Sequence, residues 1–258
     1  MTQQQKNFPE FYVTAPQPCP YLPGRSERKV FTHLTHDKPA SVVDHLLKGG
    51  FRRSQNIAYM PYCDGCQSCV STRVLAADFP FTRDRRRILK RNSTLVVRRQ
   101  APIATAEQYA LFRRYIDSRH SDGGMVDMTK SDFAMMIEDS IVDTFVAEYR
   151  EPIPSTNSHQ AEASAKAGRL IAVALCDRLS DGVSMVYSFY DPNLTERSLG
   201  TYMILEHIEY AQREKLSFVY LGYWIRGSRK MSYKTRFHPQ EHLTADGWTA
   251  VAELPNAD

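Results

Sequence analysis

Residues Arg169 to Tyr190 read RLIAVALCDRLSDGVSMVYSFY, and this stretch decides the fold that we expect. Its first part, Arg169 to Arg178, and its last part, Val183 to Tyr190, are apolar runs with the length and composition of strands. Asp181-Gly182 lies between them and is a turn signal. The stretch therefore predicts a β-hairpin.

The segments around this hairpin extend it into a longer pattern. Thr144 to Tyr149 predicts a strand before it, Leu199 to Lys215 predicts a helix after it, and Leu216 to Tyr223 predicts a buried strand. A meander, a hairpin, a helix and a last strand that splays away from the hairpin make up the GNAT acyltransferase core. We therefore expect an α+β chain in which a GNAT-like domain covers residues 99–250.

The sequence before that domain predicts a mixed α/β domain over residues 1–98. Its arm, Phe8 to Arg28, holds five prolines and should run extended or form turns. Ser41 is the expected N-cap of a short helix that Gly49-Gly50 ends. A turn with three cysteines joins two expected strands, and residues 251–258 are expected to form a flexible tail. The two strands are Asn56 to Tyr62 and Ser71 to Ala76.

Three more helices are expected before the hairpin. Phe81 to Asn92 is a basic stretch whose register suits a helix. Thr105 and Gln108 form a capping box at the start of the second. Ser131 is the expected N-cap of the third, which covers Asp132 to Asp139.

The composition is typical of an ordinary globular chain, because 42% of the 258 residues are hydrophobic and 24% are charged. No apolar run approaches the roughly 18 to 20 residues of a membrane-spanning helix, so no membrane contact is expected. Met1 to Glu10 is polar and shows no export signal. Five cysteines, an odd number, argue against a disulfide framework. We therefore expect a cytoplasmic location.

Positive charge is concentrated in the first hundred residues, which hold 17 Lys and Arg against 7 Asp and Glu. The rest of the chain holds 16 against 22. Clustered cations gain affinity for a phosphate backbone by releasing its counterions. The densest stretch therefore predicts an RNA-binding helix face, and its alternative is a solvated face. The cations of this stretch are Arg83, Arg86, Arg87, Lys90 and Arg91.

A second basic segment, Tyr220 to Pro239, interleaves aromatic residues with cations. Aromatic faces stack on bases or on a terminal ribose while cations meet phosphates, so this segment predicts contact with a single-stranded nucleic-acid end. Its candidate cations are Arg229, Lys230 and Lys234. The alternative is a buried strand followed by a solvated loop.

Cys63, Cys66 and Cys69 follow the spacing Cys-x-x-Cys-x-x-Cys, and Cys19 is a candidate fourth ligand upstream. Three thiolates at this spacing can hold one soft ion or an iron-sulfur cluster, and the spacing does not separate iron from zinc. The alternative is a set of reduced thiols packed around a turn.

The segment Lys-Met-x-Tyr-Lys over Lys230 to Lys234, with the preceding Tyr-Leu-Gly-Tyr, is the most specific of several motifs. The others are Cys19 to Leu22, Gly50 to Ser54, Tyr59 to Cys69 and Arg86 to Asn92. Read together, they resemble the arginyl-tRNA-protein transferase family, and most closely its bacterial branch. The resemblance covers about residues 10 to 245.

This resemblance implies an aminoacyltransferase of the N-end rule pathway. In the bacterial branch the donor is leucyl-tRNA, and the acceptors are proteins with an N-terminal Asp or Glu, which the transfer marks for degradation. An aminoacyl-tRNA ester is already activated, so the transfer requires no covalent intermediate and no cofactor. Alternatives are an arginyl donor, an RNA-binding module without transferase activity, and an acetyl-CoA N-acetyltransferase.

The reaction needs residues that position the acceptor amine, remove its proton and pair with its carboxylate. Candidates for positioning or proton transfer are Tyr187, Tyr190, Glu206 and Tyr223. Candidates for the cation that meets the acceptor's carboxylate are Arg52, Arg53 and Arg73. The basic residues named above are then the expected tRNA contacts.

Overall fold

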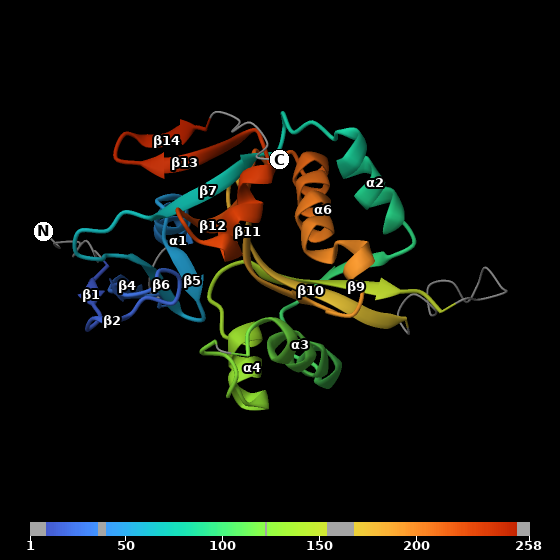
Figure 1. Ribbon diagram of the computed structural model, residues 1–258, viewed down its shortest axis with the longest axis horizontal. Coiled ribbons are helices and arrows are strands. Elements are labelled where there is room, and N and C mark those ends of the chain that lie inside the picture. The colour runs from blue at the N-terminus through green and yellow to red at the C-terminus, as the bar shows by residue number, and fades with distance from the viewer. Residues whose placement is uncertain (1–8, 36–39, 122, 154–167, 252–258) are drawn as a thin grey trace, which may run out of the picture.

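The computed structural model describes residues 9–35, 40–121, 123–153 and 168–251. An eight-stranded sheet runs through the molecule (Figure 1). All of its neighbouring strands are antiparallel except β11 and β12, which are parallel. In order of pairing, the strands are β14 (Gly247–Ala250), β13 (Gln240–Thr244), β7 (Cys69–Leu75), β12 (Phe218–Ile225), β11 (Gly182–Tyr190), β10 (Arg169–Arg178), β9 (Thr144–Glu151) and β8 (Val96–Gln100).

The predicted hairpin is confirmed as β10 and β11. The amide of Leu179 donates to the carbonyl of Gly182 at 2.8 Å and closes its turn. β10 is buried on both faces: Val173 packs in one apolar cluster, whereas its neighbours Ala172 and Ala174 pack in another. This strand therefore needs helices on both sides of the sheet.

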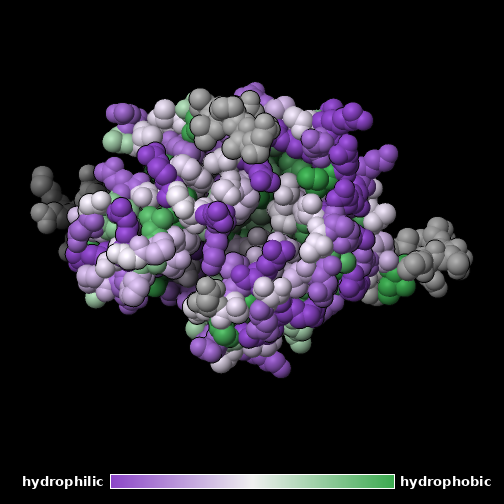
Figure 2. All heavy atoms as spheres, viewed as in Figure 1, coloured by the Kyte–Doolittle hydropathy of each residue, from purple (hydrophilic) through white to green (hydrophobic). Residues whose placement is uncertain are grey.

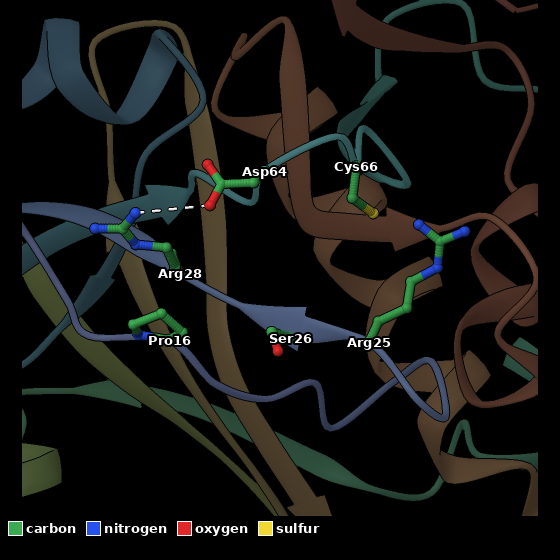
Figure 3. A pocket seen from close by; sticks show the side chains of 6 residues that line it. All are labelled: Pro16, Arg25, Ser26, Arg28, Asp64 and Cys66. Atoms are coloured by element: carbon green, nitrogen blue, oxygen red, sulfur yellow. Dashed lines mark ion pairs between the residues drawn. The ribbon is translucent and has the colours of Figure 1, made fainter.

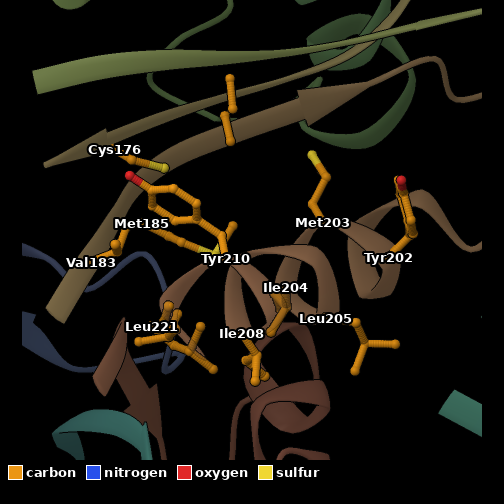
Figure 4. Packing of buried hydrophobic residues seen from close by; sticks show 14 of the residues in the cluster. Cys176, Val183, Met185, Tyr202, Met203, Ile204, Leu205, Ile208, Tyr210 and Leu221 are labelled. Carbon is orange, nitrogen blue, oxygen red and sulfur yellow. The ribbon is translucent and has the colours of Figure 1, made fainter. Parts of the chain in front are cut away.

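Four helices supply that cover (Figure 1). α6 (Leu199–Arg213) and α2 (Arg83–Arg91) lie on one face, and α3 (Ala106–Arg119) and α4 (Lys130–Glu138) lie on the other. Figure 4 shows part of the core on the α6 side, where the helix points a row of apolar side chains at the sheet. Each face thus has its own hydrophobic core.

A smaller four-stranded sheet lies beside the large one (Figure 1). A cluster of apolar side chains, including Leu47 of the helix α1 (Ala40–Lys48) and Tyr220 of β12, joins the two sheets. Within the described residues, the proline-rich arm is extended with a turn between β2 and β3, as the prediction of an extended or turn-rich arm allows. In order of pairing, the small sheet is β1 (Tyr12–Val13), β4 (Lys29–His33), β6 (Ile57–Pro61) and β5 (Arg52–Ser54), and the arm also forms the pair β2 (Gln17–Pro18) and β3 (Ser26–Glu27).

The predicted α+β class with a GNAT-like core is confirmed, because the meander, the hairpin, α6 and β12 follow one another in the expected order. One strand crosses the expected division of the chain: β7 comes from the N-terminal region but lies between β12 and β13. The expected boundary after residue 98 falls inside β8. The division into two domains and the tail stay predictions, and residues 252–258 of the tail lie outside the described residues.

Two expected helix starts are wrong, and one is confirmed. Thr129 caps α4 in place of Ser131, because its side chain accepts from the amide of Asp132 while that carboxylate accepts from the amide of Thr129. α1 already includes Ala40, so Ser41 lies within the helix. At α3 the predicted capping box of Thr105 and Gln108 is present.

Several elements lack a sequence prediction. The most important is the 3₁₀ helix η3 (Arg229–Arg236), which holds the second basic segment. Others are the strands β4 and β5, the hairpin of β13 and β14, and the 3₁₀ helix η2 (Thr195–Arg197). None of the helices in the described ranges is long and apolar enough to cross a membrane.

Candidate active site

β11 and β12 separate soon after they begin to pair. Their parallel pairing covers three registered pairs, of which Ser184↔Tyr220 is the last, whereas β11 continues to Tyr190 and β12 to Ile225. The two strands therefore splay, as the predicted order of elements requires. We call the space between them the splay. Main-chain groups along it are open to a side chain or a ligand.

The guanidinium of Arg52 lies in the splay. Its Nη2 donates to the carbonyls of Met185 at 2.8 Å and Val186 at 3.0 Å on β11. A Cβ atom at Gly222 of β12 would lie 2.6 Å from the Cζ of Arg52, so the strand approaches closely only because this residue is glycine. The Nη1 of Arg52 is buried and has no hydrogen-bond partner among the described residues. It remains a strong donor for an anionic group.

Lys234 on η3 reaches the same part of β12. Its side chain is buried, and its Nζ donates to the carbonyl of Tyr223 at 2.6 Å. Burial, followed by the positive charge of Arg52, lowers the pKa of Lys234 to about 7. The predicted contact between Lys234 and a tRNA phosphate is not supported, because this amine lies inside the protein, unlike those of exposed lysines.

Four tyrosines form an aromatic wall near these cations: Tyr115, Tyr187, Tyr190 and Tyr233. The rings of Tyr115 and Tyr190 have centroids 5.0 Å apart. Burial, then the neighbouring Tyr190, Tyr187 and Tyr233, raises the pKa of Tyr115. Tyr233 is 41% exposed, so one edge of the wall meets solvent. Such a wall can hold an apolar side chain or a base.

Tyr223 has a different role from the wall. Its hydroxyl donates to the carbonyls of Gly50 at 2.9 Å and Tyr59 at 3.3 Å, so it joins β12 to the small sheet. Burial raises the pKa of Tyr223, and burial also raises the pKa of Tyr187 to about 12. Neither phenol is suited to accept a proton near neutral pH.

Glu206 belongs to a separate buried network on α6. Arg99 donates to both carboxylate oxygens at 2.7 Å, and the Tyr149 hydroxyl donates to Oε2 at 3.1 Å. Burial acts to raise the pKa of Glu206, but the charges of His207 and Arg99 and the hydrogen bonds lower it below its ordinary value. This carboxylate therefore stays ionised, and its oxygens already accept hydrogen bonds from Arg99 and Tyr149. Both observations argue against the predicted role in proton transfer.

Two of the three candidate arginines already have carboxylate partners. Arg53 is buried and forms a two-point pair with Asp177, with both N···O distances 2.7 Å. Arg73 pairs with Glu241 at 2.7 Å, and its Cζ lies 3.6 Å from the centroid of the Phe218 ring. Of the predicted cations for an acceptor carboxylate, Arg52 alone retains a buried nitrogen without a partner.

The basic helix α2 has an exposed face, and hydrophilic atoms gather over it in Figure 2. Arg83, Arg86, Arg87, Lys90 and Arg91 are all exposed. Among them, Arg87 pairs with Asp84 at 3.4 Å and Arg91 donates to the carbonyl of Glu196.

Arg85 connects this face to η3. Its guanidinium donates to the carbonyls of Arg236 and His238, so the two basic segments are adjacent. Arg229 and Lys230 are exposed on η3. The predicted tRNA contacts, Lys234 excepted, therefore lie on one connected side of the molecule.

The four N-terminal cysteines lie near one another as free thiols. Burial, then the neighbouring Cys63, Cys19 and Cys66, raises the pKa of Cys69 to about 11. Within the described ranges, no group of three or more His, Cys, Asp or Glu has an arrangement that could hold a metal ion. The donor set thus does not fit the predicted zinc ion or iron-sulfur cluster.

A pocket of about 240 Å³ lies beside these cysteines (Figure 3). Arg28 pairs with Asp64 at 3.7 Å on one side, and Arg25 extends toward Cys66 on the other. Hydrogen bonds from Ser68, and then the charge of Arg25, lower the pKa of Cys66 below its ordinary value. The pocket is lined by both charges and shares no lining residue with the contacts of Arg52 and Lys234.

The sequence did not predict two features of the candidate site. Tyr115 was not singled out, although it directly precedes Ile116 on the apolar face of α3. The burial of Lys234 was also missed, because alternation of cations and aromatic residues in Lys230 to Lys234 is equally typical of an exposed loop. The adjacent Tyr233 was the available signal, since an aromatic ring beside a lysine favours partial burial.

Comparison with known proteins gives a consistent result for the whole chain. Residues 107–244 match the family model "Arginine-tRNA-protein transferase, C terminus", and residues 17–87 match "Arginine-tRNA-protein transferase, N terminus". An aspartate/glutamate leucyltransferase of Bradyrhizobium sp. strain BTAi1 is 57% identical over 97% of this chain and 95% of its own length. One of Rhodopseudomonas palustris strain HaA2 is 55% identical over 97% of this chain and 96% of its own length.

Solved structures show a more distant likeness. L-PGS from Bacillus licheniformis has a TM-score of 0.44 and 9% identity, and it covers 61% of this chain and 46% of its own. FemX has a TM-score of 0.43 and 10% identity, and it covers 75% of this chain and 62% of its own.

Proposed function

Because the chain belongs to the arginine-tRNA-protein transferase family, we propose that it transfers leucine from leucyl-tRNA to the N-terminal amine of proteins that begin with Asp or Glu. The product carries an N-terminal leucine, which marks the protein for degradation. The relatives support this choice of donor, because they are named leucyltransferases and are 55% and 57% identical over nearly the full chain. The name of the family model, by contrast, contains arginine.

The observation that carries the proposal is the pair of cations in the splay. Arg52 keeps a buried nitrogen without a partner, and Lys234 approaches the residue next to Gly222. An acceptor that begins with Asp or Glu brings a side-chain carboxylate and an α-amine on the same residue. Such a molecule complements a site with one unpaired guanidinium and one amine.

The transfer depends on positioning of the two substrates more than on a protein nucleophile. The ester of an aminoacyl-tRNA is activated, so the enzyme has to bring the acceptor amine onto the ester carbonyl carbon and to stabilise the charge that develops on its oxygen. We assign Arg52 to the acceptor's carboxylate and the aromatic wall to the leucine side chain or the terminal adenosine. The transfer needs no cofactor for these steps.

The basic surfaces of α2 and η3 are assigned to the tRNA. Arg85 holds the two segments together, so a tRNA backbone that follows α2 reaches η3 and then the exposed edge of Tyr233. This path would bring the aminoacylated end to the splay while the rest of the tRNA stays on the surface.

Transfer of labelled leucine from leucyl-tRNA to a peptide that begins with Glu tests the proposal. We expect transfer to the Glu peptide and little transfer to the matched Gln peptide, which lacks the charge. Arginyl-tRNA and labelled acetyl-CoA, offered in parallel, should label the peptide much more slowly. Binding of tRNA without any peptide labelling would favour the alternative of an RNA-binding module, and faster transfer of arginine would overturn the choice of donor.

A further inference from the structure

Resting on the function proposed above, we propose that Lys234 is the general base of the transfer, which takes a proton from the α-ammonium group of the acceptor. The inference begins with the surroundings of its amine. The Lys234 side chain is 6% exposed, and its Nζ donates to one group, the Tyr223 carbonyl. A primary amine held by one acceptor keeps its remaining positions for a substrate.

No carboxylate of the described residues balances this buried lysine. Among the described residues, Lys234 forms no ion pair with Asp or Glu, and the charged neighbour that acts on it is Arg52. Beside its amine lie the main-chain carbonyl of Tyr223 from β12 and the phenol ring of Tyr233 from η3 itself, whose centroid is 6.0 Å from the Nζ. A buried ammonium beside another cation is unfavourable, so the uncharged amine is favoured. The lowered pKa of Lys234, about 7, agrees with this buried position beside Arg52.

Other lysines show that this arrangement is not general in the chain. Lys48 pairs with Asp44 at 3.2 Å, and Lys29 pairs with Glu27 at 2.8 Å. Both are partly exposed and carry an ordinary counter-ion. These two lysines each have a carboxylate partner, whereas Lys234 has none among the described residues.

The remaining candidates for the base are less suited. The Glu206 carboxylate is held by Arg99 at 2.7 Å and has a lowered pKa, so it is a weak proton acceptor. The hydroxyl of Tyr223 donates to two backbone carbonyls. Lys234 is thus the one candidate at the splay that both faces Arg52 and can accept a proton near neutral pH.

The reaction then balances as follows. The acceptor's α-ammonium gives one proton to the neutral Nζ of Lys234, and the freed nitrogen lone pair forms a C–N bond with the ester carbonyl carbon. The tetrahedral intermediate collapses, the C–O bond to the terminal ribose breaks, and a second proton passes from nitrogen to the leaving ribose oxygen. The third proton stays on the new amide. Lys234 returns its proton to water before the next cycle.

The test compares two acceptors that differ in their need for a base. One is a Glu-initiated peptide, and the other is its analogue with an aminooxy group in place of the α-amine, which is uncharged at neutral pH. Single-turnover transfer of leucine is measured between pH 6 and 9 for the wild-type protein and for Lys234→Met and Lys234→Arg. Lys130→Met, which changes an exposed lysine on α4, is the control, and a melting curve for each variant reports its folding.

With the ordinary peptide at pH 7, we expect both Lys234 variants to be slower by a factor of about 100 or more, because general acid–base catalysis typically contributes about 10²- to 10⁴-fold. With the aminooxy acceptor the defect should shrink at least about tenfold, since no ammonium has to be deprotonated. Lys130→Met should match the wild type on both acceptors.

A charge-stabilising or structural role gives other results. An active Lys234→Arg variant, or a defect of equal size on both acceptors, would overturn the assignment of the base while leaving the transfer itself established. Absence of leucine transfer by the wild-type protein would instead overturn the proposed function together with this inference. If Lys234→Met does not fold, Lys234→Gln takes its place in the same comparison.

Discussion

Arg52 and Arg53 are consecutive residues of β5, yet their guanidinium groups meet opposite surroundings. Arg53 is turned toward β10 and β9, where both oxygens of Asp177 and the hydroxyl of Thr144 accept its hydrogen bonds. Arg52 is turned toward the splay, where it meets main-chain carbonyls and keeps one buried nitrogen without a partner. Because successive side chains of a strand point to opposite faces, one arginine makes a structural contact and the next lies in the candidate site.

This difference separates the two uses of a buried charge. A paired charge is satisfied in the folded protein, and removing its partner leaves the other charge stranded. An unpaired charge lowers stability in the free protein and becomes favourable when a ligand brings the opposite charge. We therefore expect changes at Arg53 to act on folding and changes at Arg52 and Lys234 to act on the reaction.

The largest effect is expected at the paired arginine. Arg53→Met leaves the buried Asp177 carboxylate without its arginine partner, so the free energy of unfolding should fall by about 3–5 kcal/mol. Urea denaturation measures this loss. The double variant Arg53→Met/Asp177→Leu should recover much of it, because no isolated charge remains. If the single variant loses less than about 1 kcal/mol, the comparison between the two arginines fails.

The next effect is expected at the unpaired arginine. Arg52→Met should lower kcat/KM for a Glu-initiated peptide by about 100-fold, since a charge-assisted hydrogen bond contributes about 1.5–3 kcal/mol. Transfer to the Gln-initiated peptide should be nearly unchanged, because that side chain carries no charge. Steady-state kinetics on the two peptides measure the difference, and an equal loss on both would remove Arg52 from carboxylate recognition.

A smaller effect concerns the cost of burying Lys234. Its pKa is lowered to about 7 in the folded protein, whereas an unfolded lysine titrates near 10.4, so the unfolded chain binds more protons between these values. Wild-type stability should therefore rise with pH in this range. Lys234→Met should be more stable than wild type by about 1–3 kcal/mol at pH 7, with the gain fading toward pH 10. A pH-independent difference in urea denaturation would contradict the assigned pKa.

The exposed cations of α2 form a third group, which faces solvent. Changing Arg86 and Arg87 to Ala should leave folding intact and lower the slope of log K against log salt by about two for tRNA binding. Filter binding over a range of salt concentrations measures this slope. The matched change at Arg113 and Arg114 on α3 should leave it unaltered, and an unchanged slope for the α2 variant would assign that face to solvent.

The smallest effect is expected at the cysteines. Cys66→Ser should change the free energy of unfolding by less than about 1 kcal/mol, because the Cys66 thiol contacts a serine hydroxyl at a partly exposed position. Thermal melting of the two proteins checks this value. A loss of several kcal/mol, together with iron or zinc in anaerobically prepared protein, would restore the metal site that the spacing predicts.

The sequence was sufficient for the core elements because each had a local signal. The hairpin of β10 and β11 follows from two apolar runs and Asp181-Gly182, and α3 follows from the capping box at Thr105. The start of α4 was misplaced because Thr129 and Ser131 are both good caps. The choice depended on Asp132, which lies three residues after Thr129 and completes its capping box.

The site was less predictable because its properties arise from contacts between distant segments. Arg52, Arg53 and Arg73 look alike in the sequence, and only Asp177 and Glu241, more than a hundred residues away, distinguish them. The same holds for Lys234, whose burial depends on its contact with β12. A residue type indicates which contacts a side chain can make. Its neighbours in the fold decide whether those contacts are already formed within the protein.

The place of β7 has a consequence for how the chain is made. This strand leaves the ribosome early, but its two neighbours, β12 and β13, begin about 140 and 165 residues later in the chain. Both of its edges therefore stay unpaired during most of synthesis, and contacts of such long sequence separation form slowly. The nascent N-terminal part is thus exposed to association with other chains until the last strands arrive.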